Sequence, residues 1–357
     1  MRLGIIGLPQ SGKTTLYNAL TRGTQPTGAA GSGKMEVHTA VVDVPDQRVD
    51  KLSGMFKPKK TIYAKVTYAD IAGLDGSSSK SGISGTLLNQ LTQMDGFIHV
   101  VRCFEDDNIP HPSGTVNPQR DIQAMEGEFI LNDMIAVERK LERLGDERKK
   151  GGGREKGLID REIELFNKFQ EALGEEIPLR DLTISTEEEK TLAGFGFLSR
   201  KPILQVLNLA EGQTAPEIPY SHKLSQMVAL QARLEMDIAQ LPPDDAAIFM
   251  EEYGISEPSL NRMIRFSYDL LGLHSFFTVG PDEVRAWTVQ RGAAAPEAAG
   301  VIHTDLQKGF IRAEVVSYTD LTTLGGMTEA KTHGKLRLEG KEYVVQDGDI
   351  LNIRFNL

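Results

Sequence analysis

Eight residues near the N-terminus have the types and spacing of a phosphate-binding loop. The run Gly7-Leu8-Pro9-Gln10-Ser11-Gly12-Lys13-Thr14 matches the pattern GxxxxGK[ST]. Its glycines let the backbone curl so that successive N–H groups point at an anion, and a following helix adds its unsatisfied donors. Lys13 would neutralise the β- and γ-phosphates, and the Thr14 hydroxyl would ligate Mg²⁺. We therefore predict a nucleotide site with Lys13 as a catalytic residue and with these phosphate-binding residues: Gly7, Pro9, Gln10, Ser11, Gly12, Lys13, Thr14 and Thr15.

The flanking residues supply the elements that such a loop needs. Leu3, Ile5 and Ile6 form an apolar run typical of a buried strand, and residues 15–20 have helical spacing. A simple glycine turn between strand and helix is the alternative. A second GxxxxGK match at residues 28–34 follows no apolar strand and has Met35 where the hydroxyl is needed. We interpret that second match as a Gly/Ser loop.

An acidic residue at the end of a later strand completes the expected metal site. Residues 63–68 alternate as a strand and lead into Asp70-Ile71-Ala72-Gly73. Asp70 would reach the Mg²⁺ shell through water, and the Gly73 N–H would meet the γ-phosphate. Leu74 stands where Ras-like GTPases place the glutamine that orients the attacking water. Because leucine cannot orient water, hydrolysis is expected to be slow or to use a residue from elsewhere.

One histidine after the next strand is a candidate for that task. Residues 97–101 form a buried strand with His99 as a core or sheet-edge histidine, and the loop 105–118 places His111 between two prolines. Imidazole can accept a proton near neutral pH, so His111 is a candidate for positioning the catalytic water. An ordinary surface-loop histidine is the alternative.

Residues 121–199 change to a helical pattern. Two apolar stripes predict an antiparallel helical hairpin, the first through Ile130, Met134, Val137, Leu141 and Leu144, the second through Ile159, Ile163, Phe166 and Leu173. Between them lies the basic turn 148–156. This tip is either a solvated turn or a contact for RNA phosphate.

A second strand-end loop is placed to contact a base. The strand 202–207 leads into Asn208-Leu209-Ala210-Glu211, where G proteins carry NKxD. An aspartate in that motif accepts two hydrogen bonds from guanine, whereas Glu211 is one methylene longer and Leu209 replaces the lysine. Adenine lacks both donors, and Asn208 is predicted to serve its 6-amino/N7 edge. A strand at 227–230, a helix at 233–241 and a closing helix at 260–273 follow, and residues 276–357 form a small β-rich module.

Composition limits the class of protein. The chain has 357 residues, a formal charge of −10 and one cysteine, Cys103. These values fit a reducing compartment and exclude a general polyanion binder, so nucleic acid contacts require a local patch. No apolar run is long enough to span a membrane and no signal-peptide pattern is present. We expect a cytoplasmic protein without membrane or DNA contacts.

Taken together, these segments resemble the YchF-type P-loop ATPases, which are relatives of the Obg GTPases. The resemblance covers nearly the whole chain and rests on the phosphate loop, DIAGL at 70–74, HVVRCFED at 99–106 and NLAE at 208–211. It continues through VRAWTV at 284–289 and VIHTDLQKGFIRAEVV at 301–316 to EGKEYVVQDGDILNIRFNL at the C-terminus, a stretch similar to a TGS domain.

The resemblance implies an α/β fold with three parts. A P-loop nucleotide-binding G domain would comprise residues 1–120 and 200–274, a helical coiled-coil insertion residues 121–199, and a ubiquitin-like β-grasp TGS domain residues 275–357. It also implies ATP as substrate with Mg²⁺, held by Thr14 and Asp70. Base contacts would come from Asn208, Leu209, Glu211 and Gln231. Association with the ribosome or its RNA, through the hairpin and the TGS domain, is implied as well.

Two positions depart from the family pattern. Lys34 occupies the place of a threonine in switch I, about five residues before Thr39, and an ammonium cannot ligate Mg²⁺. Gln231 replaces a small residue in the base-contacting loop. The leading prediction is an ATP-hydrolysing switch. An Obg-like GTPase, and a nucleotide-gated RNA- or ribosome-binding protein with little turnover, are the alternatives.

Overall fold

The computed structural model describes residues 1–23, 37–71, 83, 85–150, 153–192, 194–253 and 255–356. Contacts between Cα atoms group the chain into two compact units, each described here by itself. The first unit comprises residues 1–40 and 67–260, and the second comprises residues 41–66 and 261–357. Within the described ranges, no helix combines the length and the apolar character that crossing a membrane requires.

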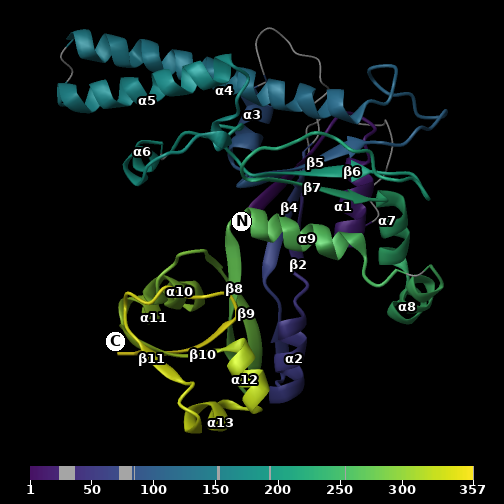
Figure 1. Cartoon of the computed structure of the whole chain (residues 1–357), viewed down its shortest axis with the longest axis vertical. Coiled ribbons are helices and arrows are strands. Elements are labelled where there is room, and N and C mark those ends of the chain that lie inside the picture. The colour runs from purple at the N-terminus through teal and green to yellow at the C-terminus, as the bar shows by residue number, and fades with distance from the viewer. Residues whose placement is uncertain are drawn as a thin grey trace. The chain divides into compact units, whose positions relative to one another are not determined.

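The first unit is organised around a six-stranded sheet with the order β2-β4-β1-β5-β6-β7 (Figure 1). Neighbouring strands from β4 to β7 run parallel. Every residue of β5 and β6 is buried, as expected for central parallel strands covered on both faces. The strand bounds are β1 Arg2–Ile6, β2 His38–Asp43, β4 Lys65–Asp70, β5 Gly96–Arg102, β6 Ile203–Asn208 and β7 Ser225–Leu230.

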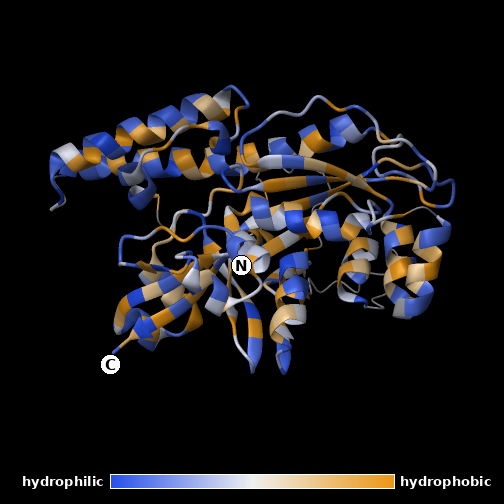
Figure 2. Ribbon diagram, turned by 60° about the horizontal axis from the view of Figure 1, so that its bottom comes forward, coloured by the Kyte–Doolittle hydropathy of each residue, from blue (hydrophilic) through white to orange (hydrophobic). Residues whose placement is uncertain are grey.

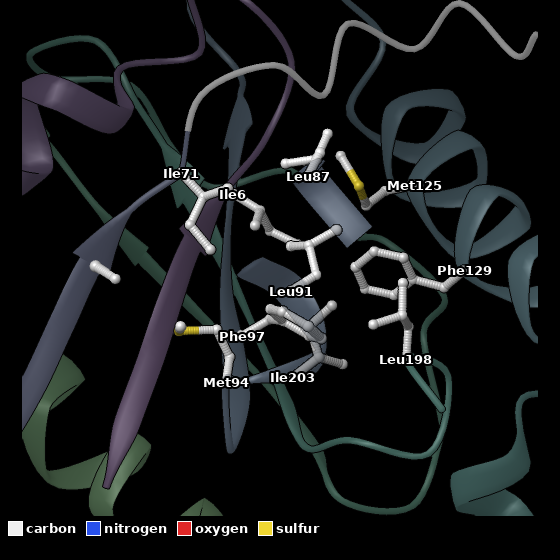
Figure 3. Packing of buried hydrophobic residues seen from close by; sticks show 11 residues of the cluster. Ile6, Ile71, Leu87, Leu91, Met94, Phe97, Met125, Phe129, Leu198 and Ile203 are labelled. Atoms are coloured by element: carbon white, nitrogen blue, oxygen red, sulfur yellow. The ribbon is translucent and has the colours of Figure 1, made fainter. Parts of the chain in front are cut away.

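Helices cover this sheet and fix its strand ends. On one face α4 packs through Met125 and Phe129, and the Phe97 and Phe129 ring centroids are 4.9 Å apart (Figure 3). On the other side, α1 and α7 pack against each other. The helix bounds in this unit are α1 Lys13–Thr21, α3 Gly85–Thr92, α4 Pro118–Lys150, α5 Lys156–Gly174, η1 Leu179–Asp181, α6 Thr186–Thr191, α7 Ala232–Gln240 and α8 Pro243–Glu252. α9 Ser259–Leu270 begins at the end of this unit and belongs mostly to the second.

The predicted helical hairpin is confirmed and consists of α4 and α5 (Figure 1). α4 begins at Pro118, crosses one face of the sheet and continues beyond it as the first arm. Hydrophilic and hydrophobic bands alternate along both arms (Figure 2). The apolar bands meet in a core that includes Val137, Leu144, Ile159 and Phe166. Burial of these seam residues holds the arms together, because a single amphipathic helix leaves its stripe in water.

A buried polar network lies where α4 leaves the sheet. The Glu126 carboxylate of α4 is paired with the Arg180 guanidinium and accepts a hydrogen bond of 2.7 Å from the Tyr220 hydroxyl. The Tyr220 hydroxyl in turn accepts a hydrogen bond from Gln205 Nε2. The carbonyl oxygen of the same Gln205 side chain is 2.7 Å from Nδ1 of the buried His99. These contacts connect β5, β6 and η1 to the root of the hairpin.

The second unit contains a sheet with the order β11-β10-β12-β8-β9-β3. β8 and β9 form an antiparallel hairpin, β8 is parallel to β12, and α10 packs on β9 and β10. Apart from β3, this is the topology of the predicted β-grasp module, which is thereby confirmed. The bounds are β3 Lys60–Ile62, β8 Leu273–Val279, β9 Glu283–Gln290, β10 Phe310–Ser317, β11 Arg337–Glu339, β12 Asp349–Phe355, α10 Ala295–Ile302, α11 Thr304–Lys308, α12 Tyr318–Leu324 and α13 Met327–Thr332.

One segment between β2 and β4 forms two elements that its sequence pattern does not predict. Residues 47–56 form α2, and residues 60–62 form β3, which pairs in parallel with β9. Asp46 caps α2 by accepting from the Arg48 N–H, and the Arg48 guanidinium lies 5.0 Å from the centre of the Phe277 ring. Residues 41–66 therefore group with the C-terminal unit, although the predicted boundaries put them in the nucleotide-binding domain. The three-part division itself stays a prediction.

Candidate functional site

The phosphate loop connects β1 to α1, as its sequence predicts. Gly7 and Gly12 have φ angles of 146° and 98°, which side chains other than glycine rarely adopt. A Cβ on Gly7 would lie 2.4 Å from the Val100 carbonyl oxygen, and one on Gly12 would lie 2.3 Å from Asn208 Nδ2. Both glycines are required because neighbouring strand-end groups approach the loop this closely.

Lys13 is folded onto the loop that it follows. Its ammonium donates to the Gly7 and Leu8 carbonyl oxygens at 3.0 and 2.8 Å. Burial lowers the pKa of Lys13 to about 8, against the attraction of Asp70, which raises it. A phosphate group that displaced the two carbonyl oxygens would contact an ammonium that already lies against the phosphate loop.

Thr14 and Asp70 lie together, which is the arrangement that a magnesium site needs. The Thr14 hydroxyl donates to Asp70 Oδ2 at 3.3 Å, and Asp70 stands at the end of β4 beside Ile5 of β1. Burial raises the pKa of Asp70, whereas Lys13 and the Thr14 hydroxyl lower it. A hydroxyl and a carboxylate are hard oxygen ligands of the kind that Mg²⁺ prefers, so both side chains fit this metal. When bound, Mg²⁺ would neutralise phosphate charge.

Asn208 has a positioning role that its sequence motif did not predict. Its Nδ2 donates to the Ser11 carbonyl oxygen, and its Oδ1 accepts from the Ala232 N–H, both at 3.0 Å. The buried amide therefore ties the phosphate loop to the start of α7. One N–H and one lone pair of this amide are left over for a base. The predicted base contact stays a prediction, whereas the positioning role is visible.

The remaining candidates for base contacts differ in exposure. Glu211 is exposed, and Leu209 is half-buried against the cluster of Val101, Cys103, Ile122 and Leu207. Gln231 precedes α7, and its Oε1 is buried without a hydrogen-bond partner in the part of the chain that the structure describes. A buried carbonyl oxygen of this kind could accept a hydrogen bond from a bound group.

His111 is buried, so the expectation of a surface-loop histidine is wrong. Its Nδ1 accepts from the Ser113 N–H at 3.1 Å, so the ring proton is on Nε2, which is 2.9 Å from Asp121 Oδ2. Arg120 holds the other oxygen of Asp121 at 2.8 Å. Because both ring nitrogens have partners, His111 cannot take a proton from water in this conformation. To act as a base, His111 must first release Nδ1 from the Ser113 N–H.

The remaining predicted residues of the phosphate loop differ in exposure. Pro9 and Gln10 are exposed, Ser11 is buried, and Thr15 lies half-buried in the first turn of α1. Gly73, Leu74 and Lys34 lie outside the described residues. Among the described residues, no group of three or more His, Cys, Asp or Glu side chains is placed to hold a metal. Among the described residues, the candidate magnesium ligands are the Thr14 hydroxyl and the Asp70 carboxylate.

Comparisons with known proteins match nearly the whole chain. The family model "50S ribosome-binding GTPase" matches residues 2–140, and the YchF-GTPase C-terminal model, described as "Protein of unknown function (DUF933)", matches residues 273–356. "Ribosome-binding ATPase YchF" from Bacillus subtilis (strain 168) is 40% identical over 365 residues, with 99% of each chain covered. The Escherichia coli O157:H7 protein of that name is also 40% identical over 365 residues, covering 100% of this chain and 99% of its own.

This chain belongs to the YchF family. The Schizosaccharomyces pombe YchF GTPase structure superimposes with a TM-score of 0.84 at 29% identity, covering 99% of this chain and 97% of that one. The family resemblance inferred from the sequence is confirmed, as is the P-loop fold.

The sequence of this YchF-family chain did not reveal which side chains hold its loops in place. Asp121 and Arg120 fix His111, and Gln213 joins the loops after β5 and β6. Asp121 stands near the start of a helix, where acidic residues are common for reasons of helix stability alone. Nothing in the type or spacing of these residues distinguishes them from surface residues.

The lowered pKa of Lys13 leads to a testable pH effect. Phosphates would restore the ordinary pKa of this ammonium, so nucleotide binding above pH 8 must be accompanied by proton uptake. At pH 8.5 a group with a pKa near 8 takes up about three-quarters of a proton on becoming fully charged. Calorimetry of Mg-ATP binding in two buffers of different ionisation enthalpy measures this uptake. Lys13→Arg, whose guanidinium stays charged, is expected to show none, and proton release by the wild type would contradict the assignment.

Proposed function

We propose that this chain is a slow ATPase that cycles on the ribosome and prefers ATP to GTP. The observation that carries the proposal is the placement of Thr14 beside Asp70, directly next to the Lys13-bearing loop. Relatives that match the whole chain are named ribosome-binding ATPases, whereas the matching fission yeast structure is titled a GTPase. These names differ in the nucleotide, so we infer the preferred base from the residues of this chain.

Two features bear on the choice between adenine and guanine. Glu211 and Leu209 replace the aspartate and lysine that recognise guanine, and each guanine hydrogen bond left unmade costs about 1–3 kcal/mol. The buried Oε1 of Gln231 is an acceptor without a partner among the described residues. Adenine offers an N–H donor at its 6-position, where guanine has an acceptor oxygen. The Gln231 amide can also rotate to present its Nε2 donor to guanine, so the preference for ATP rests on Glu211 and Leu209.

Turnover is expected to be slow in the free protein. Leu74 supplies no polar atom to orient water, and both nitrogens of His111 are engaged. In our proposal Lys13 leaves the Gly7 and Leu8 carbonyls to hold the β- and γ-phosphates, and Thr14 and Asp70 hold the magnesium ion. His111 would accept a proton from the water only after Nδ1 is released from the Ser113 N–H. Ribosome binding is the event proposed to complete the site, and groups supplied in trans are worth about 10³–10⁵ in rate.

The hairpin and the β-grasp module are the proposed ribosome contacts. At the tip of the hairpin, Arg148 is paired with Asp160 at 2.6 Å, and Arg154 is paired with Glu147 and Glu162. The basic turn predicted from the sequence is thus partly neutralised by carboxylates of the same hairpin. An RNA phosphate would have to compete with these pairs, of which the exposed Arg148–Asp160 pair is individually weak, whereas Glu162 is buried.

Multiple-turnover phosphate release with ATP and with GTP, with and without ribosomes, tests the proposal. We expect ATP to bind more tightly than GTP, basal release to be slow, and ribosomes to accelerate it. His111→Ala is expected to reduce the accelerated rate.

The double variant Leu209→Lys/Glu211→Asp is expected to gain GTP affinity, because it restores the guanine-reading pair. A wild type that prefers GTP would favour an Obg-like GTPase, and absent turnover even with ribosomes would favour a nucleotide-gated binding protein.

A further inference from the structure

The side chain of Gln213 joins two loops at the carboxyl edge of the first sheet. Its Oε1 accepts from the Ala210 N–H at 2.8 Å, and its Nε2 donates to the Cys103 carbonyl oxygen at 2.6 Å. The Gln213 N–H also donates to the Ala210 carbonyl at 3.2 Å, which closes a turn around Glu211. Both ends of this amide are thus used, one inside the base-contacting turn and the other on the neighbouring loop.

The loop that begins at Cys103 is the one that carries His111. It leaves β5 beside the end of β6, where Arg102 and Asn208 are paired in register and the Cys103 N–H donates to the Asn208 carbonyl at 2.9 Å. The buried Arg102 guanidinium then donates to the Phe104 carbonyl at 3.0 Å and to the Ile109 carbonyl at 2.7 Å. These bonds hold residues 104–109 as one folded segment between Cys103 and His111.

We propose that Gln213 is a positioning residue that couples the base-contacting turn to the His111 loop. Glu211 lies inside the turn that Gln213 closes, so a base that displaces Glu211 also displaces the Gln213 amide. Because this amide is hydrogen-bonded to the Cys103 carbonyl, its displacement also moves Cys103. The folded segment held by Arg102 transmits this movement toward His111. The base thereby influences the rate of hydrolysis and not only the affinity. This inference rests on the proposed ATPase function and adds a determinant of base specificity to it.

One substitution separates the two halves of the contact. Gln213→Glu keeps an oxygen that accepts from the Ala210 N–H, but it replaces the Nε2 donor with a second oxygen that repels the Cys103 carbonyl. The turn is retained and the link between the loops is broken. Gln213→Ala removes both contacts and serves as the second variant. Gln226→Glu makes the same chemical change at an exposed position of β7 and is the matched control.

Hydrogen exchange with and without a non-hydrolysable ATP analogue and Mg²⁺ measures the coupling. In the wild type and Gln226→Glu, the analogue is expected to change exchange in residues 208–213 and also in residues 103–117. In Gln213→Glu the change is expected to persist in 208–213 and to disappear in 103–117. The ratio of kcat for ATP to kcat for GTP is expected to fall about tenfold, as for the loss of one hydrogen bond, while KM for ATP stays within about twofold.

The possible results are distinguishable. If the analogue changes 103–117 equally in the wild type, Gln213→Glu and Gln213→Ala, the coupling is overturned while the proposed function stands. The same conclusion follows if the wild type responds only in 208–213. If the wild type binds no ATP, the proposed function fails and the inference fails with it. A thermal melt of each variant verifies that the fold is retained.

Discussion

Replacement of Lys13 by alanine is expected to remove ATP hydrolysis and to weaken Mg-ATP binding by about 10²–10⁴-fold. The ammonium is the charged group that the structure places on the phosphate loop, where it now donates to two carbonyl oxygens. Two charge-assisted hydrogen bonds to phosphate are worth about 1.5–3 kcal/mol each, and every 1.4 kcal/mol changes affinity tenfold. Lys13 is the only basic residue of α1, so no other cation of this helix replaces the lost charge.

Calorimetry and phosphate release measure the effect, and Lys149→Ala at the exposed end of α4 is the matched control for loss of one positive charge. The fold is expected to survive Lys13→Ala. Burial lowers the pKa of this lysine, so holding it charged at neutral pH costs stability in the free protein. This loss of stability is fully present below about pH 8, and it decreases as the pH rises from the pKa of the folded state toward the ordinary pKa of lysine. Unchanged ATP affinity in a folded Lys13→Ala variant would contradict the assignment of the phosphate loop.

The structure around the candidate site that the sequence predicts correctly is the part that is local in the chain. The strand, loop and helix around Gly7 and Gly12 are specified by apolar spacing and by glycines whose φ angles other residues rarely adopt. Asp70 was assigned from its place at the end of a strand, and parallel strands bring such ends to one edge of the sheet. That geometric rule is why Thr14 and Asp70 were expected to meet across a long stretch of chain.

Contacts between distant segments account for what the sequence did not reveal. The segment 47–56 has only Val49 and Leu52 buried, so its apolar pattern was too sparse to predict α2. β3 is three residues long and is stabilised by pairing Lys60 to Ile62 with Glu283 to Arg285, a partner that its own sequence does not identify. His111 is buried because Asp121 and Ser113 satisfy both of its nitrogens, and the composition of its loop alone suggested exposure.

The last prediction concerns the buried ion pair at the root of the hairpin. Arg180→Ala is expected to lower the free energy of unfolding of the first unit by about 3–5 kcal/mol, since removing one partner leaves the other as an uncompensated buried charge. Glu126, Arg180 and Gln205 are at most 8% exposed, so water cannot replace the lost guanidinium. Arg180 also donates to the Ser199 carbonyl at 3.1 Å and to the Tyr220 hydroxyl at 3.2 Å, and both contacts vanish with it.

Urea titration followed by circular dichroism at 222 nm measures this loss in the helix-rich first unit. The single tryptophan, Trp287, lies in β9 and reports separately on the second unit, whose transition is expected to move less. Arg200→Ala is the matched control, because Arg200 pairs with the more exposed Glu189, and such surface pairs are worth about 0–1 kcal/mol. The double variant Glu126→Leu/Arg180→Met is expected to recover much of the loss, because it leaves no charge buried. Equal destabilisation by Arg180→Ala and Arg200→Ala would show that the buried network does not hold the hairpin to the sheet.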